Sequence, residues 1–503
     1  MTHRRRALLG AALALGLSLA VSGCLFSPSR DMEVVIDDGT LRGVADDGVR
    51  SWLGIPYAAP PVDDLRWRPP EPPAPWSDVR HAQKFESECV QVGPEGVSDT
   101  SSEDCLYLNV FRPDTDEKEL PVMVWLHGGG LTVGNGNLAL DMVAGLVEHG
   151  VVVVSINYRL GRLGYFAHSA LATEGGKAGP VANFGLLDQV AALRWVQDNV
   201  AEFGGDPAAV TIFGISAGGA SVNYLMTSPL AKGLFARAIS GSGLGREQPP
   251  TWQEAAAEGE ALAAAVGRPS ADAATLRGLD AGTVAALPTY QLRDDIPILD
   301  PALPMSVADA FARGHEAAVP YLVGSTDAEL LDATYLQALG VDPVAERERY
   351  AAGHEAEVGA AYGDERDQHL LNDLIFTEPA RYLAEQHVDR APTYRYRFSI
   401  ASDEAAVAFG GAIHGSDLPF VFGWADGAPK VDNAKDLAEE VSGCWASFAT
   451  TGTPSCGGVE WPQADDGLVE LTNDGPDAGS DDPWQERLDL VEGIREQLAA
   501  ATP

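Results

Sequence analysis

Three short apolar segments, each bounded by glycine or polar residues, constrain the fold of this chain more than any other feature. They cover residues 122–126, 151–157 and 210–213 and are rich in β-branched side chains, as strands buried on both faces of a parallel sheet are. Helical patterns over 139–149 and 186–200 separate them. Consecutive strand–helix–strand units predict an α/β fold: a large, mainly parallel central sheet with helices on both faces.

Weaker patterns surround these segments. Two strands are expected at 33–44 and 49–55, joined through the turn Asp46-Asp47-Gly48, and a proline-rich loop follows over 56–76. Helical blocks cover 252–288 and 306–387, the second interrupted by a strand at 320–324. Without an internal repeat or a clear linker in the sequence, residues 32–503 are expected to form one domain with helical insertions.

The charge balance excludes one class of partner. The 503 residues carry 34 Lys and Arg against 73 Asp and Glu, a formal net charge of −39. Such a surface repels phosphate backbones, so nucleic acid is not an expected partner.

The N-terminus has the pattern of an export signal. Three arginines at positions 4–6 precede the uncharged run 7–21, which is shorter than the roughly 20 apolar residues that span a bilayer. The run ends in Val21-Ser22-Gly23-Cys24, which resembles a bacterial lipobox, in which the cysteine is lipidated. Residues 1–23 are therefore predicted to be a lipoprotein-type signal peptide and 24–31 a tether that anchors an exported protein to a membrane. The alternative is a soluble secreted protein with an incidental Cys24, and both Sec and twin-arginine export stay open.

Four further cysteines fit an exported protein. They allow three pairings, of which the local one joins Cys89 to Cys105 and Cys444 to Cys456. Their spacings do not match those of zinc sites, so no metal is predicted.

A strand–turn–helix pattern contains the first candidate catalytic residue. The strand 210–213 runs into Gly214-Ile215-Ser216-Ala217-Gly218, a GxSxG sequence, and the small residues after the serine can begin a helix. Such an elbow exposes the serine hydroxyl at the carboxyl end of a sheet, next to a helix N-terminus. Ser216 is thus a candidate nucleophile.

A second glycine-rich turn, His127-Gly128-Gly129-Gly130, follows the strand 122–126. Acyl transfer develops an oxyanion that preorganised backbone N–H groups must stabilise, and glycines let the backbone come close to a substrate. The N–H groups of Gly129, Gly130 and Ala217 are therefore predicted to form an oxyanion hole.

A nucleophilic serine needs a base, and the base needs an orienting carboxylate. His414 lies in a glycine-rich loop able to reach an active site, whereas the histidines at 354, 369 and 387 lie in charged helical stretches and are expected at the surface. After the strand 320–323, Asp327 and Glu329 both qualify as the acid.

These features resemble the type-B carboxylesterase/lipase family, which includes bacterial para-nitrobenzyl esterases, cholinesterases and neuroligins. The resemblance covers nearly the whole chain after residue 31. It includes the segments 53–61 (LGIPYAAPP), 102–110 (SEDCLYLNV), 183–189 (NFGLLDQ) and 203–207 (FGGDP).

The resemblance implies an α/β-hydrolase fold with Ser216 as nucleophile and His414 as base. The family's acid lies five residues after a strand-end glycine, which from Gly324 selects Glu329 over Asp327. It also implies the oxyanion-hole positions named above and an N-terminal disulfide between Cys89 and Cys105.

The chain departs from the family pattern at several positions. Ile215 replaces the usual glutamate before the nucleophile, which predicts a lower pKa for the base than in relatives. Leu131 replaces a common aromatic residue, and Ala328-Glu329-Leu330 replaces Asp-Glu-Gly. The loop between Cys89 and Cys105 has no aromatic side chain to hold a quaternary ammonium, which argues against choline esters as specific substrates.

The resemblance thus implies a serine carboxylic-ester hydrolase that forms a covalent acyl-enzyme on small to medium uncharged esters and needs no cofactor. Two alternatives remain: an amide or carbamate hydrolase using the same site, and a non-catalytic binding protein like the neuroligins, which usually lose the nucleophile.

Overall fold

The computed structural model describes residues 32–93, 96–174, 176–288, 297–329, 342–479 and 482–501. The expected signal peptide, the tether with Cys24, and Leu330 lie outside the described residues.

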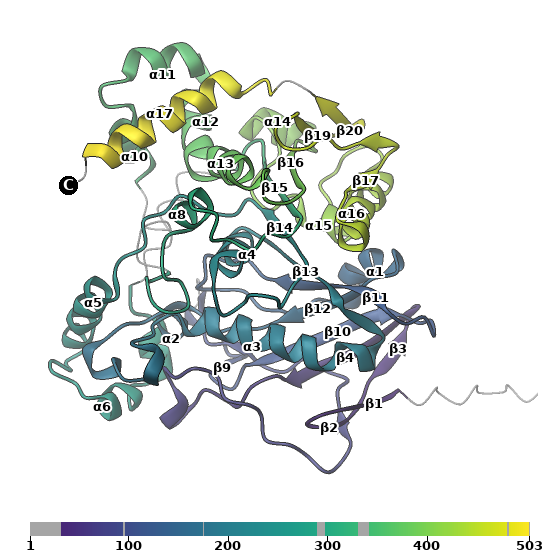
Figure 1. Cartoon of the computed structure of the whole chain (residues 1–503), viewed down its shortest axis with the longest axis vertical. Coiled ribbons are helices and arrows are strands. Elements are labelled where there is room, and N and C mark those ends of the chain that lie inside the picture. Colours follow the sequence, from purple (N-terminus) through teal and green to yellow (C-terminus); the bar gives the residue numbers. More distant parts are fainter. Residues whose placement is uncertain are drawn as a thin grey trace, which may run out of the picture.

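A mixed 11-stranded sheet crosses the molecule (Figure 1). In spatial order its strands are β20 (Gly475–Gly479), β19 (Leu468–Thr472), β16 (Thr393–Phe398), β15 (Tyr321–Thr326), β14 (Arg237–Gly241), β13 (Gly205–Ile215), β11 (Leu120–Leu126), β12 (Val152–Ile156), β10 (Tyr107–Pro113), β4 (Val49–Pro56) and β3 (Val44–Asp46). The strands from β19 to β12 are parallel, and those at both edges are antiparallel. The mainly parallel sheet is confirmed, with antiparallel edges in addition.

Helices cover both faces of the sheet, because its central strands are apolar on both sides. Along β11, Val124 packs into the cluster formed with α3 (Phe184–Asn199) and α4 (Ala217–Thr227). Its neighbour Trp125 packs on the opposite face with α1 (Leu140–Glu148) and α16 (Ala434–Thr451). This alternation follows from the two-residue period of a strand.

The remaining helices lie partly within the predicted helical blocks 252–288 and 306–387 and partly outside them. They are α2 (Gly161–Gly164), α5 (Trp252–Ala265), α6 (Ala273–Arg277), α7 (Ala281–Ala285), α8 (Val307–Ala312), α10 (Pro343–Ala351), α11 (Glu355–Tyr362), α12 (Arg366–Asn372), the π-helix Asp373–Thr377, α13 (Glu378–His387), α14 (Asp403–Phe409), α15 (Leu418–Val421) and α17 (Gln485–Ala501). Figure 1 shows the C-terminal helix α17 beside α11, α12 and α13.

Two predictions about the fold were wrong. The expected strand at 33–44 is broken by a turn at Asp37 and Asp38 into β1 (Glu33–Ile36) and β2 (Gly39–Arg42), which pair with each other. His369 and His387 are buried rather than solvated. The Nδ1 atom of His387 lies 3.0 Å from Glu316 Oε1, and its Nε2 lies 2.9 Å from the carbonyl oxygen of Val319. Helix α13 packs against β15, β16 and α8, so its polar side chains also face protein.

Both predicted disulfides are present. Cys89 is bonded to Cys105 and Cys444 to Cys456, with Cα–Cα distances of 4.9 and 5.0 Å. The first closes a loop near the N-terminal end of β10, and the second ties α16 to β17 (Ser455–Cys456).

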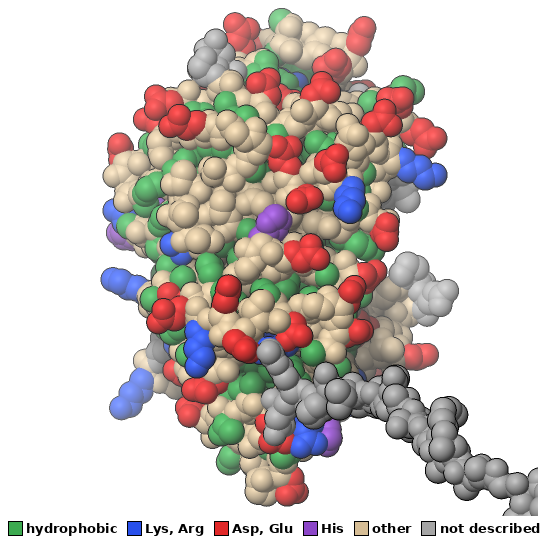
Figure 2. Space-filling model, turned by 90° about the vertical axis from the view of Figure 1, so that its right-hand side faces the viewer, with side chains coloured by type: hydrophobic (Ala, Val, Ile, Leu, Met, Phe, Trp, Pro, Cys, Tyr) green, Lys and Arg blue, Asp and Glu red, His purple; other side chains and the backbone are tan. Residues whose placement is uncertain are grey.

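The surface is strongly acidic. Figure 2 shows Asp and Glu side chains scattered over one whole face, with few Lys and Arg between them. Within the described ranges, no helix is long and apolar enough to cross a membrane, and no group of three or more His, Cys, Asp or Glu side chains could hold a metal ion.

Candidate active site

Ser216 lies at a sharp turn between a strand and a helix. β13 ends at Ile215 and α4 begins at Ala217, and Ser216 between them has φ 61° and ψ −127°. A residue with a side chain rarely adopts this conformation, which costs on the order of 1–3 kcal/mol. Such stored strain is typical of functional sites.

The glycines around the serine are required by close backbone contacts. A Cβ atom on Gly214 would lie 2.4 Å from the carbonyl carbon of Gly218. One on Gly218 would lie 2.0 Å from the carbonyl oxygen of Leu126, at the end of β11. The GxSxG spacing therefore lets β13, α4 and β11 meet at one point.

The glycine turn after β11 lies against this elbow. A Cβ atom on Gly128 would lie 3.3 Å from the Cβ of Ser216. Gly129 and Gly130 have φ angles of 102° and 62°, and the Gly129 carbonyl accepts hydrogen bonds from the N–H groups of Thr132 and Val133. Within the part of the chain that the structure describes, the N–H groups of Gly129 and Gly130 donate to no backbone carbonyl.

The third predicted donor, Ala217, is the first residue of α4, where backbone N–H groups have no partner within the helix. The three predicted oxyanion-hole residues thus lie at the same edge of the sheet as Ser216. Their N–H groups are available for an acceptor.

A buried histidine supports the glycine turn. The imidazole of His127 is stacked on Tyr158 with ring centroids 4.2 Å apart, and its Nδ1 lies 2.8 Å from the Gly128 carbonyl oxygen. Burial lowers the pKa of His127 to about 4, so the ring is neutral near pH 7. It is a structural support for the turn.

Glu329 and His414 form a buried hydrogen-bonded pair. The Nδ1 of His414 contacts Glu329 Oε2, and the backbone N–H of His414 donates to the carbonyl oxygen of Glu329 at 3.1 Å. The other carboxylate oxygen of Glu329 accepts hydrogen bonds from the hydroxyl of Ser242 (2.6 Å) and the N–H of Thr326 (2.8 Å). Four interactions therefore fix the carboxylate and the imidazole relative to each other.

The environment of His414 favours its protonated form. Burial acts to lower its pKa, but the charge and hydrogen bond of Glu329, aided by Asp417, outweigh burial and raise the pKa above the ordinary value. A histidine held in this way accepts a proton readily.

Asp327, the other candidate acid, does not contact the imidazole. Its Oδ1 accepts a hydrogen bond from the N–H of Ala412 at 2.6 Å, two residues before His414. The geometry therefore pairs Glu329 with His414 and leaves Asp327 at the base of the His414 loop.

The serine elbow adjoins this pair through β14. The N–H of Ser216 donates to the Gly241 carbonyl at 2.9 Å, and the next residue, Ser242, binds Glu329. Among the described residues the Ser216 hydroxyl itself forms no hydrogen bond. Hydrogen bonds between catalytic groups are often long without substrate and tighten in the complex.

Two polar residues of this site were not found from the sequence. Ser242 follows β14, and only its place in a Ser-Gly-Ser-Gly run after a strand could have indicated it. Asp417 lies three residues after His414 and is 1% exposed, and neither carboxylate oxygen has a hydrogen-bond partner among the described residues. Burial and the charge of Glu329 raise the pKa of Asp417 to about 7, against the opposing effect of His414.

Apolar side chains line the surroundings. Phe376, on the π-helix, lies with its ring centroid 4.9 Å from that of His414. Ile215 and Leu131, two departures from the family pattern, are both buried, and Leu131 has a φ of 59°.

Comparison with known proteins agrees with this geometry. The sequence model of the Carboxylesterase family matches residues 30–357 and 345–476. The para-nitrobenzyl esterase of Bacillus subtilis (strain 168) is 37% identical over 470 residues, covering 84% of this chain and 91% of that protein. The fumonisin B1 esterase of Sphingopyxis macrogoltabida is 37% identical over 469 residues, covering 84% of this chain and 83% of that protein.

A solved structure of a PNB esterase superposes with a TM-score of 0.78 at 34% sequence identity, covering 92% of this chain and 100% of that chain. The α/β-hydrolase fold implied by the sequence motifs is confirmed. The family match spans most of the chain and includes the serine elbow, the glycine turn and the His414 loop, so this chain belongs to the carboxylesterase family.

Proposed function

We propose that this carboxylesterase hydrolyses esters with Ser216 as nucleophile, His414 as general base and acid, and Glu329 as the residue that orients the imidazole. His414 removes the Ser216 proton while the serine oxygen attacks the ester carbonyl. The tetrahedral intermediate collapses, the ester C–O bond breaks, and the alcohol leaves with the proton from His414. Water, deprotonated by His414, then attacks the acyl-enzyme, and the acid leaves as Ser216 regains its proton.

The oxyanion of each intermediate is assigned to the N–H groups of Gly129, Gly130 and Ala217. Each donor of this kind stabilises a transition state by about 3 kcal/mol. The single observation that carries the proposal is the buried Glu329–His414 pair beside the strained Ser216 elbow.

The proposed substrates are small to medium uncharged esters. Phe376, Leu131 and Ile215 provide apolar surroundings, and the net charge of −39 disfavours anionic substrates. The loop between Cys89 and Cys105 offers no aromatic ring for a quaternary ammonium. Relatives named for para-nitrobenzyl and fumonisin esters support an ester of an organic alcohol.

Export and anchoring are part of the proposal. Two disulfides are typical of oxidising compartments, which supports a removed signal peptide at 1–23. Lipidation of Cys24 would then tether the single domain 32–503 to a membrane through residues 24–31. Expression of the full chain and of Cys24→Ala, followed by membrane fractionation, tests this. Wild type is expected in the membrane fraction and the variant in the soluble fraction, and identical fractionation would contradict the anchor.

The catalytic assignment is tested with p-nitrophenyl esters of increasing acyl length. Ser216→Ala is expected to lower kcat by a factor on the order of 10³ or more on every ester, with unchanged thermal stability. Ser447→Ala is the matched control and keeps wild-type rates, because the Ser447 hydroxyl on α16 contacts only backbone groups of that region: it donates to the Cys444 carbonyl and accepts the N–H of Ser455. Residual activity of Ser216→Ala within tenfold of wild type would contradict the nucleophile.

A further inference from the structure

The residues that follow β15 are hydrogen-bonded to the loop that contains His414. The N–H of Ala328 donates to the Ala412 carbonyl at 3.0 Å, and Ala328 and Ile413 form an isolated parallel bridge. The N–H of Asp327 donates to the Phe398 carbonyl at 3.0 Å, at the end of β16. The segment after β15 is therefore anchored to β16 on one side and to the loop on the other.

The Asp327 carboxylate adds a side-chain hydrogen bond between the segment after β15 and the His414 loop. Its Oδ1 accepts the N–H of Ala412 at 2.6 Å, so Ala412 is held at both its N–H and its carbonyl. Two residues further along, Glu329 holds both the backbone N–H and the imidazole of His414. Asp327 and Glu329 thus form hydrogen bonds with successive residues of one loop, and of the two only Glu329 is bonded to the imidazole of His414.

The loop is shaped to receive the Asp327 side chain. A Cβ atom on Gly411 would lie 2.2 Å from Asp327 Oδ1 and 2.7 Å from Oδ2. The absence of a side chain at position 411 lets the carboxylate lie directly on the loop backbone. A carboxylate that was merely solvated would not need this space.

Several charged or titratable groups face Asp327 from neighbouring elements. Glu470 on β19 raises its pKa, Arg397 on β16 lowers it, and the ring of His369 on α12 faces its backbone. The hydroxyl of Ser399 lies beside the carboxylate and donates to Glu470 at 2.7 Å. Burial is the largest cause of a pKa of about 6 for Asp327. The carboxylate is therefore ionised near pH 8 and protonated near pH 5.

We propose that Asp327 is a positioning residue for ester hydrolysis, which fixes the His414 loop through a charge-assisted hydrogen bond to the N–H of Ala412. The inference rests on the proposed function, because it acts through His414 as the base. Asp327 binds the loop backbone at Ala412, whereas the imidazole is bonded to Glu329.

The first test compares Asp327→Ala with Asp327→Asn on p-nitrophenyl acetate. The alanine variant loses the acceptor, and a small displacement of a catalytic group lowers rates on the order of 10- to 100-fold. We expect that loss in kcat with KM within about twofold of wild type. The asparagine variant keeps a neutral acceptor, so kcat at pH 8 should fall only about threefold, since hydrogen bonds to charged groups are stronger.

The pH dependence separates positioning from a general structural role. Below pH 6 the wild-type carboxyl is protonated and, like the asparagine amide, offers a neutral acceptor. The ratio of wild-type to Asp327→Asn kcat should therefore fall from about 3 at pH 8 to about 1 at pH 5. If Asp327→Asn lowered kcat only by destabilising the fold, the wild-type to variant ratio would not return to 1 as the wild-type carboxyl becomes protonated.

Two further variants approach the contact from outside Asp327. Gly411→Ala displaces the carboxylate from the loop side and should reproduce the kcat loss of Asp327→Ala. Glu470→Gln keeps an acceptor for Ser399 but removes a neighbouring charge. It should leave kcat at pH 8 unchanged while Asp327 titrates at lower pH.

The proposal is overturned if Asp327→Ala, folded by circular dichroism, keeps kcat within twofold of wild type, or if the wild-type to Asp327→Asn ratio is the same at pH 5 and pH 8. The Ser216→Ala measurement is made in the same series. If that variant stays active, the proposed function fails, whereas its loss together with an active Asp327→Ala rejects only this inference.

Discussion

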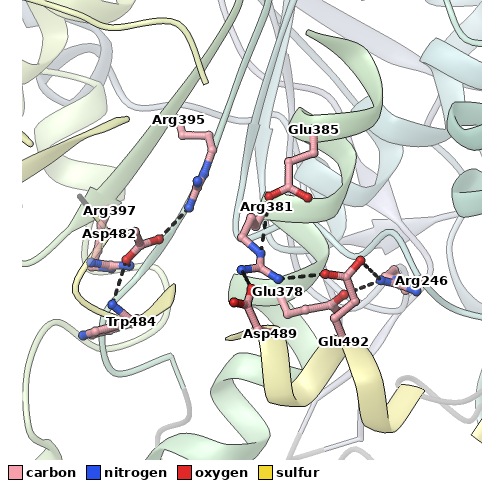
Figure 3. Close-up of polar contacts among 10 residues, drawn as sticks. All are labelled: Arg246, Glu378, Arg381, Glu385, Arg395, Arg397, Asp482, Trp484, Asp489 and Glu492. Atoms are coloured by element: carbon pink, nitrogen blue, oxygen red, sulfur yellow. Dashed lines mark hydrogen bonds and ion pairs between the residues drawn. The ribbon is translucent and has the colours of Figure 1, made fainter. Parts of the chain in front are cut away.

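Two clusters of charged side chains in this protein differ in what neutralises their carboxylates. The catalytic-edge cluster consists of Glu329, His414 and Asp417. The C-terminal arginine cluster joins α13, β16 and the loop after β14 to α17 and the residues before it (Figure 3). Its members are Arg246, Glu378, Arg381, Glu385, Arg395, Arg397, Asp482, Trp484, Asp489 and Glu492.

In the C-terminal arginine cluster, each carboxylate has a guanidinium partner. Arg381 binds Asp489 at 2.6 Å and Glu492 at 2.8 Å, and Asp482 accepts from both Arg395 and Arg397 at 2.7 Å. Burial raises the pKa of Asp482, but the two arginines outweigh it and the pKa lies below the ordinary value. At Glu378 and Glu385, by contrast, burial outweighs the arginine partners and raises the pKa above the ordinary value.

In the catalytic-edge cluster, no arginine forms an ion pair with Glu329 or Asp417 among the described residues. Burial therefore dominates at Asp417 and raises its pKa to about 7. Two arginines therefore hold Asp482 ionised, whereas Asp417, which has none, can take up a proton near neutral pH. Groups that exchange protons in this range are typical of catalytic sites.

The largest effect is expected from a substitution in the catalytic-edge cluster. Glu329→Gln keeps the size of the side chain but removes the charge that stabilises protonated His414. By analogy with loss of the triad carboxylate in serine proteases, kcat should fall on the order of 10³- to 10⁴-fold. Steady-state kinetics on p-nitrophenyl acetate, with thermal unfolding to confirm the fold, measures this. A loss below tenfold would show that Glu329 does not orient the base.

The second-largest effect is expected from a substitution in the C-terminal arginine cluster. The guanidinium of Arg246 contacts Glu378, which is fully buried, and lies over the ring of Tyr382 at 3.8 Å. Arg246→Met leaves that carboxylate with Arg495 alone, and should lower the free energy of unfolding by about 3 kcal/mol with kcat per folded molecule unchanged.

Urea unfolding measures this loss, and Arg313→Met is the matched control. The Arg313 pair with Asp309 is 3.6 Å long and more than half exposed at both ends, so its loss should cost less than about 0.5 kcal/mol. Equal effects of the two variants would contradict a structural role for the cluster.

The third effect concerns stability at the catalytic edge. The pKa of Asp417 is raised from 3.8 to about 7 in the folded protein, so the folded state holds a proton that the unfolded chain releases between these values. Stability from this group is present below pH 3.8 and is lost as pH rises to 7.

Asp417→Asn cannot ionise and escapes that loss. Relative to wild type, the variant should gain about 1–3 kcal/mol at pH 8 and little at pH 4. Urea unfolding at both pH values tests this. A gain that is equal at the two pH values would show that ionisation of Asp417 does not destabilise the fold.

Features that depend on neighbouring residues in the chain could be predicted from the sequence. The Ser216 elbow and the Gly129–Gly130 turn follow from backbone crowding, which only glycine relieves, and short apolar runs identified the central strands. The choice of Glu329 over Asp327 needed the family's spacing. By local chemistry both carboxylates qualified, and Asp327 indeed binds the same loop.

Features that depend on packing between distant segments were missed. His387 lies in a charged stretch, yet α13 is covered on both sides, so its ring is buried against Glu316. Ser242 reaches Glu329 across 87 positions of sequence. The burial of Asp417 likewise depends on how the loop after His414 folds back, which no local pattern encodes.

The smallest expected effects adjust the charge around His414 in opposite directions. Asp417 helps to raise the pKa of His414, so Asp417→Asn should lower that pKa and move the acidic limb of the kcat profile to lower pH.

Ile215→Glu adds a carboxylate and should move the acidic limb of the kcat profile to higher pH. Ile215 is buried at the end of β13, and a Cβ atom on Gly241 would lie 3.1 Å from Ile215 Cγ1 and 2.8 Å from the Tyr396 hydroxyl. That hydroxyl has no partner among the described residues and could donate to the new carboxylate. Ile215→Gln is the neutral control and should leave the limb in place. If the limbs of Ile215→Glu and wild type coincide, a charge at this position does not reach His414, and the loss of the family's glutamate has no bearing on its base.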